Sequence, residues 1–217
     1  MNAILVKSHS SLIKNCKNYI QSIFQLIMII ISQNITNYEI PVPENAVFRI
    51  NLAWVNSIDE LSKILKTHES HKIFLDLPIN RTKPPNNKYT LDQIIEIIKS
   101  HPNIQYFAIS NVESKNDLSE YIEKLPKSIT LVPKIESPTG VENISEIATA
   151  LDYKQRVMML DHDDLYSKLL KSNQPPEKFT YYINQLAEFC KSNDIVLLRT
   201  IGVIFSDDEK RISNYVN

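Results

Sequence analysis

Residues 129–161 read ITLVPKIESPTGVENISEIATALDYKQRVMMLD, and this stretch decides the predicted fold class. It opens with an apolar run at 129–136, continues with a helical pattern at 141–150 and closes with a second apolar run at 156–161. Two strands joined by one helix with short links run parallel, and the helix covers one face of their sheet. Strand interiors that are apolar throughout indicate that both faces of the sheet are buried. The stretch therefore predicts an α/β fold.

The same alternation extends along the chain in both directions. Further strands are predicted at 3–7, 47–53, 72–77, 106–110 and 194–200, and further helices at 12–32, 58–66, 91–100, 116–124, 163–171 and 177–192. Ser57 and Thr90 directly precede two of these helices, and both residue types are good N-caps. Because the alternation runs from residue 3 to residue 200 without a break, we expect a single domain, 1–217.

Two architectures suit these seven parallel strands, a (β/α) TIM-type barrel and an open doubly wound sheet. The open sheet usually carries a glycine-rich first turn, whereas this chain contains only Gly140 and Gly202. Polar residues end most of the strands instead: Arg49, Asn51, Asp76, Ser110, Lys134, Glu136, Asp161, Asp164, Arg199 and Thr200. Polar groups that converge from several strands on one rim are typical of a barrel's active site. We therefore expect a TIM-type barrel with seven clear strands.

Closure of that barrel needs an eighth strand or a cover over the seam, because open sheet edges expose unpaired backbone groups. Residues 202–205 are a candidate for a short eighth strand. The alternative is that a second copy of the chain or another partner covers the seam, so a homo-oligomer is expected.

The overall composition narrows the classes of function. With 24 basic and 25 acidic residues and no basic stripe, nothing points to nucleic acid. Two isolated glycines cannot form a dinucleotide fingerprint or a GxxxxGK phosphate loop. The most apolar run, 23–31, is far shorter than the roughly 20 residues that cross a bilayer, and no cleavable signal pattern begins the chain. Cys16 and Cys190 lie far apart and suit reduced thiols, so the expected location is the cytoplasm.

The candidate chemistry lies where two neighbouring strands end. Glu136 ends one strand and Asp164 follows the next, and two carboxylates with a substrate oxygen suit Mg²⁺ or Mn²⁺. Lys134 points to the same side of its strand as Glu136 and is placed to hold the oxygen of an enolate. The alternative is that these residues are solvated strand ends, with Asp163 as the N-cap of the following helix.

Four segments, in order and at barrel spacing, carry a family resemblance. They are VFRINLAW (47–54), IFLDLPINRTKPP (73–85), FAISNVESKNDLSEYIEKL (107–125) and LVPKIESPTGVENISEIA (131–148), the last followed by an acidic DDL. The last segment resembles the phosphoenolpyruvate/pyruvate barrel superfamily, which includes pyruvate kinase, the citrate lyase β-subunit and the HpcH/HpaI aldolases. The other three are similar to pyruvate kinase in particular. The resemblance covers about 47–200 and implies the fold and chemistry of that superfamily.

The resemblance also implies roles for the residues that match functional positions of those enzymes. The implied roles are ligation of Mg²⁺ or Mn²⁺ by Glu136 and Asp164, catalysis by Lys134 and Thr200, and substrate binding by Arg49, Asn51 and Arg81. Asn51 and Asp76 also match ligands of K⁺, although Leu77 replaces the threonine that many pyruvate kinases carry beside them.

The predicted function is that of a metal-dependent enzyme acting on pyruvate- or phosphoenolpyruvate-type oxoacids through a metal-stabilised enolate. Pyruvate kinase inserts a lid domain after its third strand, where this chain has only residues 78–88. Because that lid excludes water during phosphoryl transfer, we expect a carbon–carbon lyase or aldolase first and a minimal phosphotransferase second. The alternative outside the enzymes is a non-catalytic relative that binds a metabolite or a protein.

One histidine and one arginine have two interpretations each, and two further histidines have one. His162 lies among carboxylates and is a catalytic candidate as general base, or else it is polar surface. His68 and His71 lack a third ligand at metal spacing and are predicted to be surface residues. Arg49 either binds a substrate anion or forms a structural ion pair with Asp76.

Overall fold

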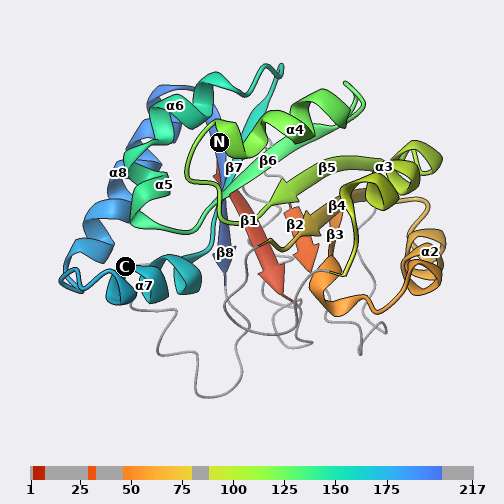
Figure 1. The fold of residues 1–217 in the computed structure, drawn as a ribbon, viewed down its shortest axis with the longest axis horizontal. Coiled ribbons are helices and arrows are strands. Elements are labelled where there is room, and N and C mark those ends of the chain that lie inside the picture. Colours follow the sequence, from red (N-terminus) through yellow and green to blue (C-terminus); the bar gives the residue numbers. More distant parts are fainter. Residues whose placement is uncertain (1, 8–28, 33–45, 80–87, 202–217) are drawn as a thin grey trace, which may run out of the picture.

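A curled, all-parallel sheet forms the centre of the molecule (Figure 1). The structure, a computed structural model, describes residues 2–7, 29–32, 46–79 and 88–201. Six of its strands, with the helices between them, make a half-barrel; they are β3 (Val47–Asn51), β4 (Lys72–Leu77), β5 (Ile104–Ile109), β6 (Thr130–Ile135), β7 (Arg156–Leu160) and β8 (Ile195–Ile201). The predicted α/β class is therefore confirmed.

Two further strands, of which only the backbone is described, continue the sheet. β1 (Asn2–Lys7) pairs in parallel with β2 (Ile29–Ser32) and with β8, and β2 pairs with β3. The strand order thus follows the chain from β1 to β8. A complete TIM-type barrel with a helix after every strand is not shown, because the chain that follows β1, β2 and β8 lies outside the described residues. The candidate strand at 202–205 lies outside them as well.

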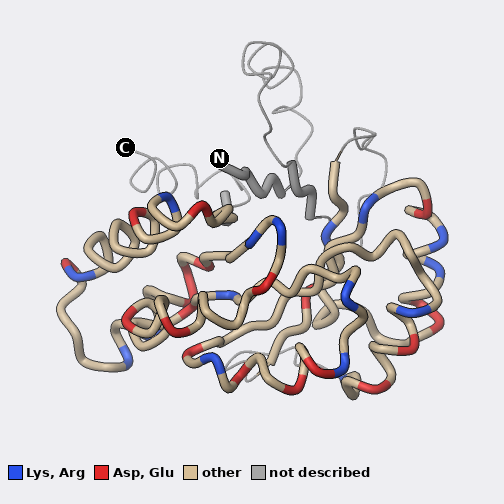
Figure 2. The backbone as a smooth tube through the Cα atoms, turned by 90° about the horizontal axis from the view of Figure 1, so that it is seen from above, with Lys and Arg blue, Asp and Glu red and all other residues tan. Residues whose placement is uncertain are grey.

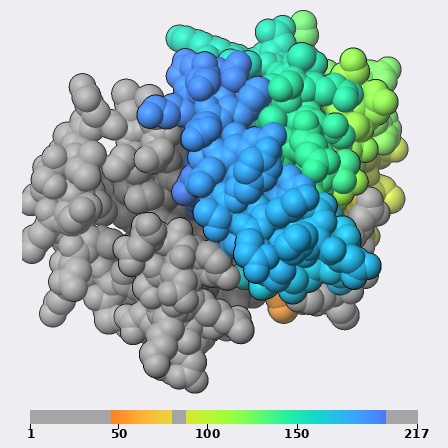
Figure 3. Space-filling view, turned by 90° about the vertical axis from the view of Figure 1, so that its left-hand side faces the viewer, coloured from red at the N-terminus to blue at the C-terminus, as the bar shows by residue number. Residues whose placement is uncertain are grey.

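The helices lie against the outer, convex face of the half-barrel (Figure 1). They are η1 (Leu52–Trp54), α2 (Ile58–Thr67), α3 (Leu91–Ser100), α4 (Asn116–Lys124), α5 (Pro138–Glu142), α6 (Ile144–Thr149), α7 (His162–Lys171) and α8 (Lys178–Ser192). Figure 3 shows α7 and α8 side by side on one face of the molecule. Basic and acidic residues are interspersed along the described backbone (Figure 2), in keeping with a net charge of -1.

Local sequence accounts for where several helices begin. The Ser57 hydroxyl accepts a hydrogen bond from the backbone N–H of Glu60 at 3.1 Å. Thr90 and Gln93 form a reciprocal capping box at the start of α3. Both predicted caps are therefore confirmed. The predicted cap at Asp163 is wrong, because the N-cap of α7 is Asp161, whose carboxylate accepts from the backbone N–H of Asp164.

Two predicted helices differ from the structure. Residues 29–32, predicted as the end of a helix over 12–32, form β2 instead. A short run of isoleucines is compatible with a buried helix or a buried strand, and β-branched side chains favour the strand. The predicted helix at 141–150 begins earlier and is divided at Asn143 into α5 and α6.

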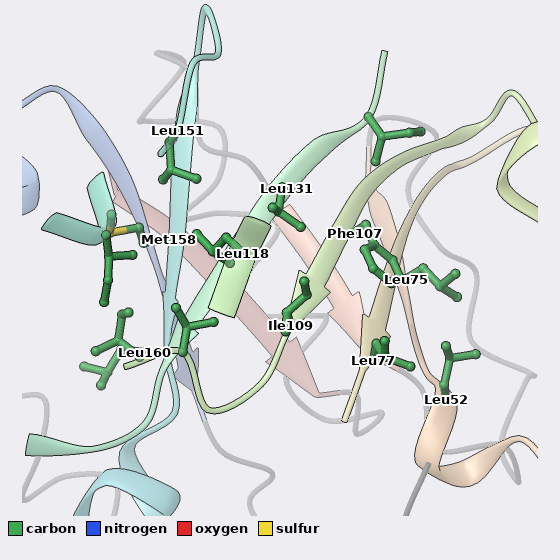
Figure 4. Close-up of a cluster of buried hydrophobic side chains, with 14 of the residues drawn as sticks. Leu52, Leu75, Leu77, Phe107, Ile109, Leu118, Leu131, Leu151, Met158 and Leu160 are labelled. Atoms are coloured by element: carbon green, nitrogen blue, oxygen red, sulfur yellow. The ribbon is translucent and has the colours of Figure 1, made fainter. Parts of the chain in front are cut away.

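Strand alternation divides the apolar core into an outer and an inner layer. The outer layer lies between the strands and the helices and includes Leu75, Phe107, Leu131, Met158 and Leu160 (Figure 4). The inner layer lines the concave face of the sheet and consists of Val47, Phe74, Ala108, Val132, Val157, Met159, Val196 and Leu198. The side chains next along the inner face, toward the carboxyl ends of the strands, are the ones that form the site.

The amino ends of the strands carry a buried histidine. His68, at the C-terminus of α2, is 6% exposed, and its ring stacks on Phe48 with centroids 3.7 Å apart. Burial, with a smaller effect of His71, lowers the pKa of His68 to about 4. The prediction that His68 is a surface residue is therefore wrong, because an imidazole held neutral packs like an aromatic ring.

No helix within the described residues has both the length and the apolarity that a membrane crossing requires.

Candidate active site at the carboxyl rim of the sheet

Four polar side chains follow the inner apolar layer by one step of strand alternation. Arg49, Asp76, Ser110 and Lys134 lie two residues beyond Val47, Phe74, Ala108 and Val132 respectively. All four are buried, with exposed fractions of 4%, 0%, 5% and 5%. Because the period of a strand is two residues, polar residues at these positions face the inside of the curled sheet and not its helices. We call these four residues the inner polar layer.

Ion pairs connect the members of this layer across three strands. The Arg49 guanidinium donates to Oδ2 of Asp76 through Nε at 3.0 Å and through a second, shorter contact of its terminal nitrogen. The Lys134 ammonium lies 3.5 Å from the same Oδ2 and donates to the Ser110 hydroxyl at 3.0 Å. It also lies 2.8 Å from Oε1 of Glu136. The structural ion pair between Arg49 and Asp76, which the sequence left as an alternative, is therefore present.

These neighbours determine the protonation of the two central groups. Burial alone would raise the pKa of Asp76, but the charges and hydrogen bonds of Lys134 and Arg49 hold it below its ordinary value. Burial alone would lower the pKa of Lys134, but Asp76 and Glu136 together raise it above its ordinary value. Both side chains are charged at neutral pH. Lys134 is therefore a fixed cation and hydrogen-bond donor and not a proton acceptor.

Three carboxylates converge next to Lys134. Glu136 follows β6 and is 1% exposed, while Asp161 and Asp164 begin the next helix, α7. One carboxylate oxygen from each lies within 4.8 Å of the others. Burial raises the pKa of Glu136, and the negative charges of Asp161 and Asp164 add to that effect while Lys134 opposes it. The structure thus brings the predicted pair Glu136 and Asp164 together and adds Asp161.

The donor set suits a hard divalent cation. All three donors are carboxylate oxygens, which Mg²⁺ and Mn²⁺ prefer over softer ligands. Three like charges at this spacing repel one another, and a dication placed among them would remove that repulsion. The remaining positions of an octahedral ion would be left for water and substrate. The residues present therefore fit Mg²⁺ or Mn²⁺.

The other predicted site residues lie outside this group or at its margin. The Asn51 side chain accepts from the backbone N–H of Ala53 at 3.0 Å and caps η1. The ring of His162 packs edge-on against Phe179 of α8, and burial, together with the charge of Arg199, lowers the pKa of His162. Thr200 lies in the backbone of β8, but its side chain is not among those described. Arg81 lies outside the described residues.

Two residues of the site did not figure among the predicted metal ligands or catalytic residues. Asp161 directly ends an apolar strand, and this position on the inner face was the available signal. Asn111 carries no signal in the sequence beyond its place after Ser110, yet its backbone N–H donates to Oε2 of Glu136 at 2.8 Å.

Comparisons with known proteins show that the fold is similar to a solved structure, but they do not assign the chain to a family. None of the known protein-family models matches the chain, and no curated protein matches its sequence. A solved structure, RipC from Yersinia pestis, superimposes with a TM-score of 0.56 at 14% identity. The match covers 99% of this chain and 84% of RipC. At this level of identity the likeness concerns the fold alone.

These findings overturn the predicted membership of the phosphoenolpyruvate/pyruvate barrel superfamily. No protein-family model, that superfamily's included, matches the chain. The part of the sheet for which the structure describes both strands and helices is a six-stranded parallel half-barrel. It is not the complete barrel of that superfamily. The short motifs that carried the resemblance describe strand ends followed by helix caps, and unrelated α/β sheets reuse that pattern. The site must therefore be argued from its own geometry.

Proposed function

We propose that the carboxyl rim of the sheet is the active site of a divalent-cation-dependent enzyme acting on a small oxoacid. In this proposal Glu136, Asp161 and Asp164 hold Mg²⁺ or Mn²⁺, and the substrate is of the pyruvate or phosphoenolpyruvate type. The proposed reaction is the cleavage or formation of a carbon–carbon bond through an enolate. A single observation carries the proposal: a cluster of three carboxylates lies directly beside a buried lysine that is charged at neutral pH.

The chain's own residues would contribute charge and position. A bound dication would supply Lewis-acid polarisation of a carbonyl oxygen. The Lys134 ammonium, held by Asp76, Ser110 and Glu136, is a preorganised donor for an oxygen on which negative charge develops. Preorganisation matters because a cation already held in place by its neighbours needs no rearrangement during the reaction. Asp76 would keep Arg49 and Lys134 in place.

The charge of the site indicates an order of binding. Arg49 and Lys134 carry two positive charges, whereas Asp76, Glu136, Asp161 and Asp164 carry four negative charges when ionised. An anionic oxoacid would meet net repulsion until a dication is present. The proposal therefore requires that oxoacid binding depends on the metal.

The proposed fold is the TIM-type barrel, in one domain, that the alternation of strands and helices predicts. The support is the pairing of β1 with β8, together with the strand order from β1 to β8. Homo-oligomer formation and a cytoplasmic location stay predictions from the sequence.

Metal binding provides the first test of this function. Saturating Mg²⁺ or Mn²⁺ at a hundredfold excess over its dissociation constant should stabilise the fold by about 2.7 kcal/mol. For a chain of this size that corresponds to a rise in melting temperature of about 5–10 °C. Glu136→Gln, Asp161→Asn and Asp164→Asn should each abolish or greatly reduce the rise. Asp161→Asn is especially informative because asparagine caps helices as well as aspartate does.

The control for this test is Glu96→Gln, which removes an exposed carboxylate that pairs with Lys99 on α3. It should keep the full metal-dependent rise. A rise that survives in all three cluster variants would contradict the metal assignment.

Ligand binding and turnover provide the second test. Calorimetry with oxalate, which mimics an enolate, should detect binding in the presence of Mg²⁺ and none after chelation. Turnover of oxaloacetate or of a 2-keto-4-hydroxy acid should follow the same dependence on metal. If neither oxalate nor pyruvate nor phosphoenolpyruvate binds in a metal-dependent way, the enzyme proposal fails and a non-catalytic binding protein replaces it.

A further inference from the structure

Asn111, directly after β5, has a left-handed backbone and lies where several elements of the rim meet. Its φ is 60°, a region that asparagine enters more readily than other residues with a side chain. This conformation places its backbone N–H toward the site, where it donates to Oε2 of Glu136 at 2.8 Å. That oxygen belongs to the carboxylate whose other oxygen contacts Lys134. Both oxygens of the most buried member of the cluster are therefore held.

The side chain of Asn111 holds this backbone in place from two sides. Its amide nitrogen donates to the carbonyl oxygen of Ile79, just after β4. Its amide oxygen accepts from the ammonium of Lys168 on α7. Lys168 lies one helical turn after Asp164, so the same helix supplies two carboxylates of the cluster and the cation that anchors Asn111. One residue thus connects the ends of β4, β5 and β6 with α7.

We infer that Asn111 is a positioning residue for the divalent cation, an inference that rests on the proposed function. In this role Asn111 would touch neither the ion nor the substrate. It acts by fixing the orientation of the Glu136 carboxylate before a cation arrives. Through its hydrogen bond with Lys168 it also fixes the position of α7 relative to the end of β6. Because cation affinity depends on ligands already held in position, loosening Asn111 should weaken cation binding more than it weakens folding.

A set of substitutions separates the backbone contribution of Asn111 from its side-chain contribution. Asn111→Gly keeps access to the left-handed conformation and loses the two side-chain hydrogen bonds. Asn111→Ala loses the same hydrogen bonds and also disfavours the conformation that directs the N–H to Glu136. We expect Mn²⁺ affinity to fall several-fold in Asn111→Gly and at least tenfold in Asn111→Ala.

Asn173 is the matched control. It is also an asparagine with a left-handed backbone, with φ of 54°, and it follows the C-terminus of α7. Its backbone N–H donates to the carbonyl oxygen of Leu170 rather than to a carboxylate. Asn173→Ala therefore introduces the same backbone strain away from the cluster. Its Mn²⁺ affinity should equal that of the wild-type chain even though its melting temperature falls.

The measurement is the dissociation constant of Mn²⁺ by calorimetry, on the full chain, with melting temperatures recorded without metal. A graded loss of affinity, largest in Asn111→Ala, smaller in Asn111→Gly and absent in Asn173→Ala, supports the inference. Equal affinities in all four proteins overturn it and leave the metal site standing. No Mn²⁺ binding by the wild-type chain overturns the metal site and this inference together. If Asn111→Ala does not fold, Asn111→Gly alone decides, because its backbone is unstrained.

Discussion

The two ends of the inner face of the sheet differ in what is buried there, which is apolar at one end and charged at the other. Toward the amino ends of the strands the inner residues are apolar, and the nearby His68, which stacks on Phe48, has its pKa lowered by burial. Toward the carboxyl ends the inner residues are the charged groups Arg49, Asp76 and Lys134, buried as completely as the apolar ones. The same strands, two residues further along, change from a hydrocarbon core to a network of ion pairs.

This difference determines which conditions each end tolerates. Apolar packing stabilises through the removal of hydrocarbon from water, which responds little to pH or to added cations. A buried network of charges is stable only while every partner is present and ionised, because a single unpaired buried charge costs several kcal/mol. The amino end therefore serves stability, whereas the stability of the carboxyl end depends on the protonation of its groups and, under the proposed function, on a bound cation. The following predictions test this contrast.

Removing the central cation should have the largest effect. Lys134→Met leaves Asp76 and Glu136 buried without their shared partner, so unfolding free energy should fall by about 3–5 kcal/mol at pH 7. Urea denaturation measures this loss. The raised pKa of Lys134 means that its contribution is fully present below pH 10 and is lost only in stronger alkali. The control Lys99→Met removes an exposed pair and should cost less than about 1 kcal/mol.

Truncating a side chain of the inner apolar layer should lower the free energy of unfolding by a similar amount. Unlike the effect of Lys134→Met, this loss should not depend on pH or on Mg²⁺. Phe74→Ala removes a fully buried ring two residues before Asp76, and we expect a loss of about 3–5 kcal/mol. Denaturation curves at pH 5 and pH 8, each with and without Mg²⁺, should show the same loss. A loss that changes strongly with pH would contradict the division into two ends. Ile122→Ala, at a half-exposed position on α4, is the control of small expected effect.

A methyl group at Gly140 should disturb the rim through its backbone. A Cβ at this position would lie 2.7 Å from the carbonyl oxygen of Val112, whose N–H donates to the carbonyl of Lys134. Gly140→Ala should therefore cost about 1–3 kcal/mol, in the range of other overpacking substitutions. Thermal unfolding measures the change. The neighbouring substitution Thr139→Ala, on an exposed side chain, should be within about 0.5 kcal/mol of wild type.

Protonation of His68 in acid should give the smallest change in the free energy of unfolding. The pKa of His68 is about 4 in the folded chain and about 6.5 when unfolded, so the unfolded state binds its proton first as pH falls. The stability that His68 contributes is present above pH 6.5 and is lost between pH 6.5 and pH 4. Allowing for solvent screening, we expect about 1–2 kcal/mol.

His68→Phe keeps an aromatic ring against Phe48 and removes the titration. Its unfolding free energy should therefore vary less between pH 7 and pH 4 than that of the wild-type chain, by the amount above. His101→Asn, which changes a histidine whose Nδ1 contacts the carbonyl of Ile97, is the control and should retain the wild-type slope. Parallel slopes in His68→Phe and wild type would show that His68 already titrates normally in the folded chain.

The sequence by itself determined the parts of the molecule that depend on neighbouring residues. Ser57 and Thr90 mark the starts of α2 and α3 because a cap and its partners lie within three residues. The apolar runs that became β3 to β8 could be recognised from composition and length. The convergence of Lys134, Glu136 and Asp164 was predictable as well, because consecutive parallel strands place their carboxyl ends on the same rim.

The tertiary structure decided what depends on partners far apart in the chain. Residues 29–32 pair as a strand because β1 and β3 lie on either side of them, and no local pattern distinguishes that run from a helix. The curl of the sheet brings Arg49 to Asp76, 27 residues away, and Asn111 to Lys168, 57 residues away. Register and curvature are collective properties of the whole sheet. For that reason the sequence could predict which charged residues belong to the site, whereas only the folded sheet determines which of them pair.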